Sequence, residues 1–233
     1  MSRLAWTVAS VALTMFAYQA SRGVHARFPS PLTNPVFLAV AGIMSLLAVP
    51  GVDYVPYRLG AEPLVALLGP ATAALAVPLY RHREIVVAYF LPAITGLVCG
   101  AIATLCAALA LGVTLGLSPI LVRSIGIKSV TAPIAVELAA LIGGDPALTV
   151  AMVVATGILG AMFGPWILDR AGVRDPVARG LALGTVATGI GTAQAAMEGE
   201  VQGAVAGVAM GAAAIFISVL APLLVPRLLQ LLI

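Results

Sequence analysis

Charged residues are scarce in this sequence, and so are histidine and cysteine. Only 9% of the 233 residues are Asp, Glu, Lys or Arg, against about 25% in an ordinary soluble domain. A soluble globule could not cover its surface with so few charges. The two histidines, His25 and His82, both stand beside arginines, and no Ser/His/Asp set, carboxylate pair or phosphate-binding Gly-Lys-Ser/Thr loop can be assembled. We therefore expect no enzyme, no catalytic residue, no metal and no cofactor.

Apolar residues make up 61% of the chain, in long unbroken runs rich in Ala, Leu, Gly and Val. A bilayer core takes about 20 apolar residues per helix, and β-barrel strands would be shorter and alternate in polarity. We therefore predict an all-α polytopic membrane protein with about seven to eight transmembrane segments, forming a single membrane domain over residues 1–233. The expected segments are 4–21, 34–49, 63–80, 85–117, 120–142, 147–168, 177–197 and 201–224.

The N-terminal run after Arg3 has the outline of a signal peptide. We expect a retained first helix instead, because the rest of the chain is equally apolar and needs membrane insertion anyway. Cys99 and Cys106 lie seven apart within one apolar run, where no metal geometry or oxidising compartment is implied. Both are interpreted as packing residues.

Basic residues stand singly or in small clusters between the apolar runs, as in cytoplasmic loops, so the net charge of +3 does not indicate nucleic-acid binding. If the clusters Arg22/His25/Arg27, Arg81/His82/Arg83 and Arg170/Arg174/Arg179 share the cytoplasmic side, the N-terminus lies outside. They do so only if segment 120–142 enters and leaves the membrane on one side or is otherwise irregular. Eight simple crossings with one misplaced cluster are the alternative.

An internal repeat also involves this segment, because residues 72–79 align without gaps on residues 131–138. The repeat units cover about 63–117 and 120–170, and the repeat can be parallel or inverted. Repeats of this kind are typical of secondary transporters, whose substrate site lies near the midplane between two discontinuous helices. Chance similarity between Ala/Leu/Val-rich segments is the alternative.

Proline inside a membrane helix frees a carbonyl and is tolerated only where protein or water surrounds it. Two segments have this pattern, and both predict a discontinuous helix with an exposed N-terminus that attracts anions. We expect a small carboxylate to bind there, although the lysine of the second segment can also snorkel to the interface from an ordinary helix. The candidate substrate-binding residues in these segments are Gly69, Pro70, Thr72, Lys128, Ser129, Thr131 and Pro133.

Four further candidate residues lie elsewhere. Glu137, within a predicted span, is the candidate for ion coupling, and an interfacial position is the alternative. The stretch 184–194 is dense in Gly and Thr, so Gly191 and Thr192 either pack helices closely or line a cavity. Asn34 precedes Pro35 and reads as a helix N-cap, with a polar lining role left open.

The strings LLGPATAALAVPLY (67–80), KSVTAPIA (128–135), TGILGAMFGP (156–165) and GTVATGIGTAQAAMEGE (184–200) closely resemble the LrgB/CidB family. Members of that family are described as bacterial inner-membrane holin-like or antiholin-like proteins linked to murein hydrolase activity and autolysis, acting beside a small LrgA/CidA-type partner. Related plastid proteins carry glycolate and glycerate, and some bacterial relatives are associated with pyruvate uptake.

The resemblance implies a multi-pass protein of the bacterial inner membrane that carries small monocarboxylates. The alternative that it implies is a regulator of autolysis that assembles with an LrgA/CidA-like partner, and we expect a homo-oligomer in either case. The chain departs from the family pattern at Ile127, where a proline is common, and at Thr188, where a histidine is frequent. The second departure weakens any histidine proton relay.

Overall fold

The computed structural model describes residues 3–49, 51–67, 70, 73–74, 76–81 and 83–232. Within these ranges every regular element is a helix. The prediction of an all-helical chain is therefore confirmed for the described residues. The chain divides into two compact units, Met1–Ala74 and Leu75–Ile233, and each is described by itself.

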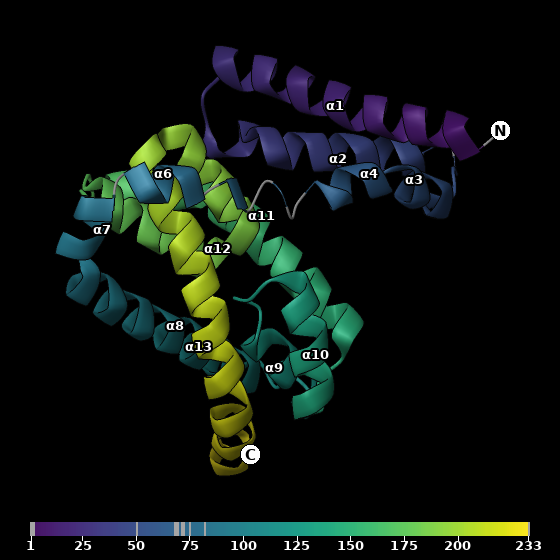
Figure 1. Ribbon diagram of the computed structural model, residues 1–233. Helices are drawn as coiled ribbons and strands as arrows, with labels where there is room; N and C mark the ends of the chain where they lie inside the picture. The colour runs from purple at the N-terminus through teal and green to yellow at the C-terminus, as the bar shows by residue number, and fades with distance from the viewer. Residues whose placement is uncertain are drawn as a thin grey trace. The chain divides into compact units, whose positions relative to one another are not determined.

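The first unit consists of α1 (Arg3–Arg27), the 3-10 turn η1 (Pro31–Thr33), α2 (Pro35–Ala48), α3 (Tyr54–Gly60) and α4 (Glu62–Ala66). α1 lies along α2 and α3 (Figure 1). The Asn34 side chain accepts hydrogen bonds from the backbone N–H groups of Val36 (3.0 Å) and Phe37 (3.4 Å). Asn34 is thus the N-cap of α2, as predicted.

The second unit begins with two short helices, α6 (Ala76–Arg81) and α7 (Arg83–Ala88), and continues with the 25-residue α8 (Phe90–Thr114). It then contains α9 (Pro119–Gly126), α10 (Ala132–Ile142), α11 (Pro146–Arg170), α12 (Pro176–Glu198) and α13 (Glu200–Leu232). Long helices therefore alternate with shorter or interrupted ones in the order α8, α9–α10, α11, α12, α13.

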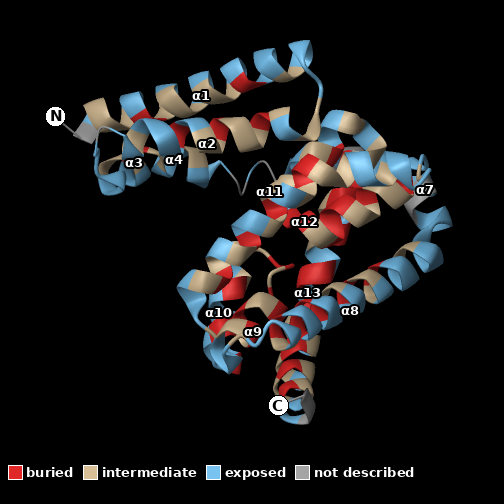
Figure 2. Ribbon diagram, turned by 180° about the vertical axis from the view of Figure 1, so that it is seen from behind, coloured by how far each residue is buried: buried red, intermediate tan, exposed pale blue. Residues whose placement is uncertain are grey.

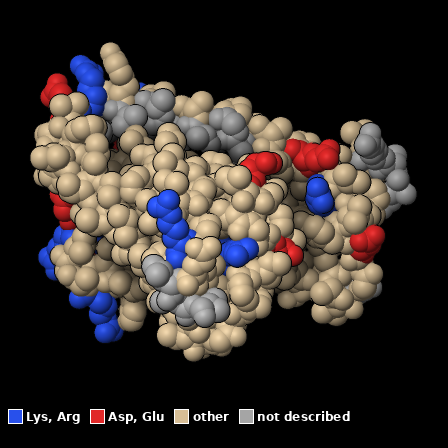
Figure 3. Space-filling model, turned by 90° about the horizontal axis from the view of Figure 1, so that it is seen from below, with Lys and Arg blue, Asp and Glu red and all other residues tan. Residues whose placement is uncertain are grey.

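Three helices among the described residues are long and apolar enough to cross a membrane: Phe90–Thr114, Pro146–Arg170 and Glu200–Gln230. Large apolar side chains are exposed along all three, for example Leu111 on α8, Leu159 on α11 and Val219 on α13. The face in Figure 3 is mostly uncharged. Such surfaces fit a lipid environment better than water.

Close helix packing in the second unit depends on glycine. A Cβ added at Gly184 would overlap the backbone of Ala206 on α13, and one at Gly160 would overlap the Ala187 side chain. Small residues let helix backbones approach in this way. Buried residues are frequent on α12 and α13 (Figure 2), and the largest apolar cluster is formed mainly by α8, α9, α10 and α13.

Two sequence interpretations need correction. Cys99 and Cys106 are both exposed on α8, so neither packs in the interior of this chain. Segment 177–197, expected to be one span, is interrupted at Thr188.

Candidate functional site

The first feature of the site is a hairpin formed by α9, residues 127–131 and α10, called the α9–α10 hairpin below. Residues 127–131 form no helix and lead from α9 to the N-terminus of α10 (Figure 1). At the base, the Ser124 hydroxyl accepts a 2.8 Å hydrogen bond from the Asp145 N–H. Because α10 has 11 residues, its N-terminus lies about 16 Å from its C-terminal end. Segment 120–142 is thus irregular, as the charge pattern predicted.

The second feature is α12, which is also a hairpin. Thr188 has φ 49° and ψ −133°, outside the helical region, and it separates the arms 176–187 and 189–198. The arms lie side by side, because Arg179 Nε donates a 2.7 Å hydrogen bond to Glu198 Oε2. In a straight helix these two residues would be about 28 Å apart along the axis. Thr188 is therefore the tip of the α12 hairpin.

The bases of the two hairpins lie at opposite ends of α11. The α9–α10 hairpin closes against Asp145, which is the N-cap of α11. The α12 hairpin closes near the other end, where Arg179 Nη1 donates a 2.6 Å hydrogen bond to Asp169 Oδ1. Since α11 has 25 residues, the two bases are separated by about 37 Å. The hairpins therefore point toward each other from opposite directions.

Both tips lie near the middle of α11. Gly157 faces Ile190 of the α12 hairpin: a Cβ added at Gly157 would lie 2.9 Å from the Cδ1 atom of Ile190. Val153, one turn away, is buried in the same core cluster as Val130 of the α9–α10 hairpin. The middle of α8 is also near both hairpins. Gly100 faces Thr185 of the α12 hairpin, and Ala101 belongs to the core cluster that includes Val130. Both tips therefore reach the middle part of α11 and of α8.

The first tip has open backbone donors. Thr131 is the N-cap of α10 but makes no side-chain capping bond, whereas Asp145 and Asp175 cap α11 and α12. Beside this end lie Lys128, the only lysine of the chain and half-buried, and Ser129, whose buried Oγ has no hydrogen-bond partner. A helix N-terminus, a cation and an unused hydroxyl together suit an anion.

The second tip is rich in threonine. Thr192 donates a 2.9 Å hydrogen bond to the carbonyl of Thr188. Gly191 is buried, and its missing Cβ would overlap the carbonyl of Leu183. Thr185 lies one turn before the tip, and its buried Oγ1 has no hydrogen-bond partner. This end thus combines close packing with one unused hydroxyl.

The structure brings together Lys128, Ser129 and Thr131 on one tip and Gly191 and Thr192 on the other. Pro133 lies in the first turn of α10 and is exposed. Glu137 is exposed on α10 and stays a prediction. Asn34 and exposed Pro70 belong to the first unit. Gly69 and Thr72 lie outside the described residues.

Two features of the site have no signal in the sequence. Thr185 lies within the Gly/Thr-rich stretch, but an unused hydroxyl becomes visible only in three dimensions. The ion pair between Arg179 and Glu198 is the second feature. Arg179 and Glu198 are 19 positions apart, so they would be far from each other in a continuous helix. Their contact can be recognised only when the helix is known to fold back at Thr188.

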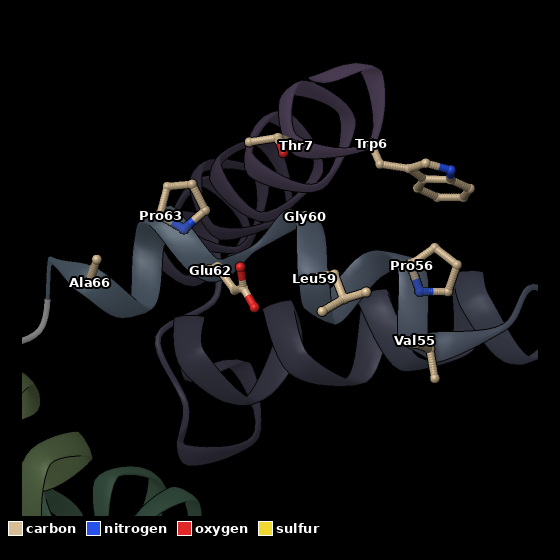
Figure 4. Close-up of a pocket in the computed structure, with 9 residues that line it drawn as sticks. All are labelled: Trp6, Thr7, Val55, Pro56, Leu59, Gly60, Glu62, Pro63 and Ala66. Atoms are coloured by element: carbon tan, nitrogen blue, oxygen red, sulfur yellow. The ribbon is translucent and has the colours of Figure 1, made fainter. Parts of the chain in front are cut away.

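Two surface hollows lie away from the tips. One, of about 620 Å³, is in the first unit between α1 and α3–α4 and is lined mainly by apolar side chains such as Trp6, Leu59 and Pro63 (Figure 4). The other lies at the base of the α12 hairpin and is lined by Asp169, Arg174, Arg179, Glu198 and neighbouring residues. Neither is lined by Lys128 or Thr131.

Comparison with known proteins shows the family of the chain. The model of the LrgB-like family matches residues 14–227. The protein YwbG of Bacillus subtilis is 34% identical over 81% of this chain and 84% of its own length, and YxaC of the same organism is 35% identical over 79% and 80%. The holin-like protein CidB of Staphylococcus epidermidis is 28% identical over 81% and 82%. No solved structure matches the chain. The chain therefore belongs to the LrgB-like family.

Proposed function

We propose that this protein is a secondary transporter of small monocarboxylates such as pyruvate, glycolate or glycerate, a multi-pass protein of the bacterial inner membrane. The observation that carries the proposal is the uncapped N-terminus of α10 beside Lys128 and the buried, unpartnered Ser129 hydroxyl. Lys128 and the free N–H groups bind the carboxylate, and Thr131 and Ser129 supply hydroxyl contacts. Pro133 keeps the helix from extending backwards through the site.

The arrangement of the two hairpins supports this proposal. Interrupted helices that enter from opposite sides and end near the midplane are the way many secondary transporters build a substrate site. Gly191 and Thr192 form the wall opposite the first tip, and rocking of one hairpin-bearing half against the other gives alternating access. In the same proposal Glu137 binds the coupling ion.

The test is uptake of labelled pyruvate, glycolate and glycerate into proteoliposomes that contain only this chain, with and without a proton gradient. We expect saturable uptake. Lys128→Ala should raise KM about tenfold or more, because a charge-assisted hydrogen bond to the substrate is lost, and Lys128→Arg should retain part of the activity. Arg227→Ala, which removes an exposed cation on α13, is the matched control.

Full uptake by folded Lys128→Ala protein would exclude the anion site. Equal gradient sensitivity in wild type and Glu137→Gln would exclude Glu137 as the coupling residue. Both readouts use the same vesicles, so the two parts of the proposal are tested separately.

A second function is favoured by the relatives themselves, since one of them is named a holin-like protein. In this reading the chain regulates murein hydrolase activity and autolysis, assembled as a homo-oligomer or with an LrgA/CidA-like partner. Absence of uptake by the purified chain, together with altered lysis of cells that carry the gene, would favour it.

A further inference from the structure

The α12 hairpin carries a hydroxyl that the described part of the chain does not use. The Thr185 residue is only 3% exposed, and its Oγ1 has no hydrogen-bond partner. A buried hydroxyl without a partner is unusual in a folded protein, and a bound ligand is one of the explanations that chemistry offers. In a helix, a threonine hydroxyl can donate a hydrogen bond to the carbonyl four residues earlier, as Thr192 does to Thr188. Thr185 does not do so.

The position of Thr185 connects it to the first tip. Its methyl carbon lies 3.9 Å from where a Cβ at Gly100 would be, so the side chain faces α8. The next residue of α8, Ala101, belongs to the core cluster that also includes Val130, and Val130 adjoins Ser129, whose buried Oγ likewise has no hydrogen-bond partner. Each hairpin thus carries a buried, unused hydroxyl at or near its tip.

We infer that Thr185 is a specificity-determining residue that hydrogen-bonds the oxygen on carbon 2 of the substrate. The inference rests on the proposed function, in which Lys128 and α10 hold the carboxylate. A hydroxyl donates to a 2-oxo oxygen and either donates to or accepts from a 2-hydroxyl. Acetate and propionate have no such oxygen and leave Thr185 unpaired, so the site takes two- and three-carbon acids that carry an oxygen on carbon 2.

The backbone near Thr185 is suited to this role. Thr188 is the only non-glycine residue with positive φ in the part of the chain that the structure describes, and strained residues of this kind persist where surrounding packing fixes them, often at ligand sites. Gly184, next to Thr185, is held against Ala206. The Thr185 hydroxyl is therefore presented by a rigid segment, as recognition of one oxygen requires.

The test measures the ratio of glycolate to acetate uptake, and of pyruvate to propionate uptake, in proteoliposomes of wild type, Thr185→Val and Thr185→Ser. Valine has nearly the same shape but no hydroxyl. We expect Thr185→Val to lower both ratios about tenfold or more with acetate and propionate uptake unchanged, and Thr185→Ser to keep the wild-type ratios. Thr114→Val, at an exposed position whose hydroxyl already bonds Leu111, is the control.

Unchanged ratios in Thr185→Val overturn the inference, and so does an equal loss of all four acids, which would assign Thr185 a structural role. If Thr185→Val does not fold, the wild type still decides, because equal transport of glycolate and acetate overturns the inference. That result leaves the proposed carrier intact, whereas no wild-type uptake of any acid removes the proposed function itself.

Discussion

At the residue scale, Thr188 has a backbone conformation that its side chain opposes. Its φ of 49° with ψ of −133° lies in a region where β-branched residues are outliers. The other positive-φ residues among those described are glycines at turns, such as Gly143 and Gly172. Thr188 therefore stores conformational strain at the tip of the α12 hairpin.

Thr188→Gly should stabilise the protein. Relief of about 1–3 kcal/mol of strain exceeds the extra chain entropy of glycine, about 0.5–1 kcal/mol, so we expect a Tm in detergent a few degrees above wild type. Thr188→Ala is the control. Alanine still has a Cβ and so keeps most of the backbone strain, but it lacks the hydroxyl and methyl groups of threonine. A Tm for Thr188→Gly at or below that of Thr188→Ala would show that the tip is not strained.

Single residues of the site could be predicted where they carry an intrinsic signal. Pro133 and the only lysine marked the first tip in the sequence, and Asn34 before Pro35 gave the N-cap that the structure confirms. Thr185 gave no such signal. Whether a threonine hydroxyl has a partner depends on neighbours from other helices, and the sequence does not contain that information.

At the element scale, the sequence predicted the long helices well because their apolar runs are continuous. It predicted the break in segment 120–142 from charge counting and from Pro133. It missed the break in α12, because no proline stands between Val177 and Glu198 and the Ala/Gly/Thr composition suits a continuous packed helix. That fold depends on tertiary contacts, chiefly the ion pair at its base and the glycine contacts with α13.

The ion pair at the base of the α12 hairpin should be required for stability. Arg179 and Glu198 side chains are 11% and 16% exposed, so removing one leaves a largely buried charge and should cost roughly 2–4 kcal/mol, somewhat below the range for fully buried pairs. Arg179→Ala should be the more damaging change. In the Glu198→Ala variant, Arg179 still has its hydrogen bond to Asp169 as a partner. Thermal unfolding and the yield of monodisperse protein measure both.

Arg81→Ala is the matched control, since the pair of Arg81 with Glu200 is exposed on both sides and should contribute little. The exchange Arg179→Glu with Glu198→Arg should recover part of the lost stability. Arg179→Ala protein as stable as Arg81→Ala protein would show that the base contact does not hold the arms together.

At the scale of the whole molecule, the two hairpins define a direction across the membrane. Their bases lie at the two ends of α11, and 25 helical residues span about 37 Å, more than the ~30 Å hydrocarbon core. The α12 end carries Arg170, Arg174 and Arg179, so by the positive-inside rule we expect it on the cytoplasmic side. The base of the α9–α10 hairpin is then expected outside.

Cysteine labelling in cells tests this topology. In a background with Cys99→Ala and Cys106→Ala, single cysteines replace Ala147, exposed in the first turn of α11, or Arg174, exposed beyond its last turn. A membrane-impermeant maleimide should react with Ala147→Cys in intact spheroplasts and with Arg174→Cys only after permeabilisation. Reaction of both cysteines from the same side would mean that α11 does not cross the membrane. The hairpins could then not approach the midplane from opposite faces, and the carboxylate site between their tips would lose its basis.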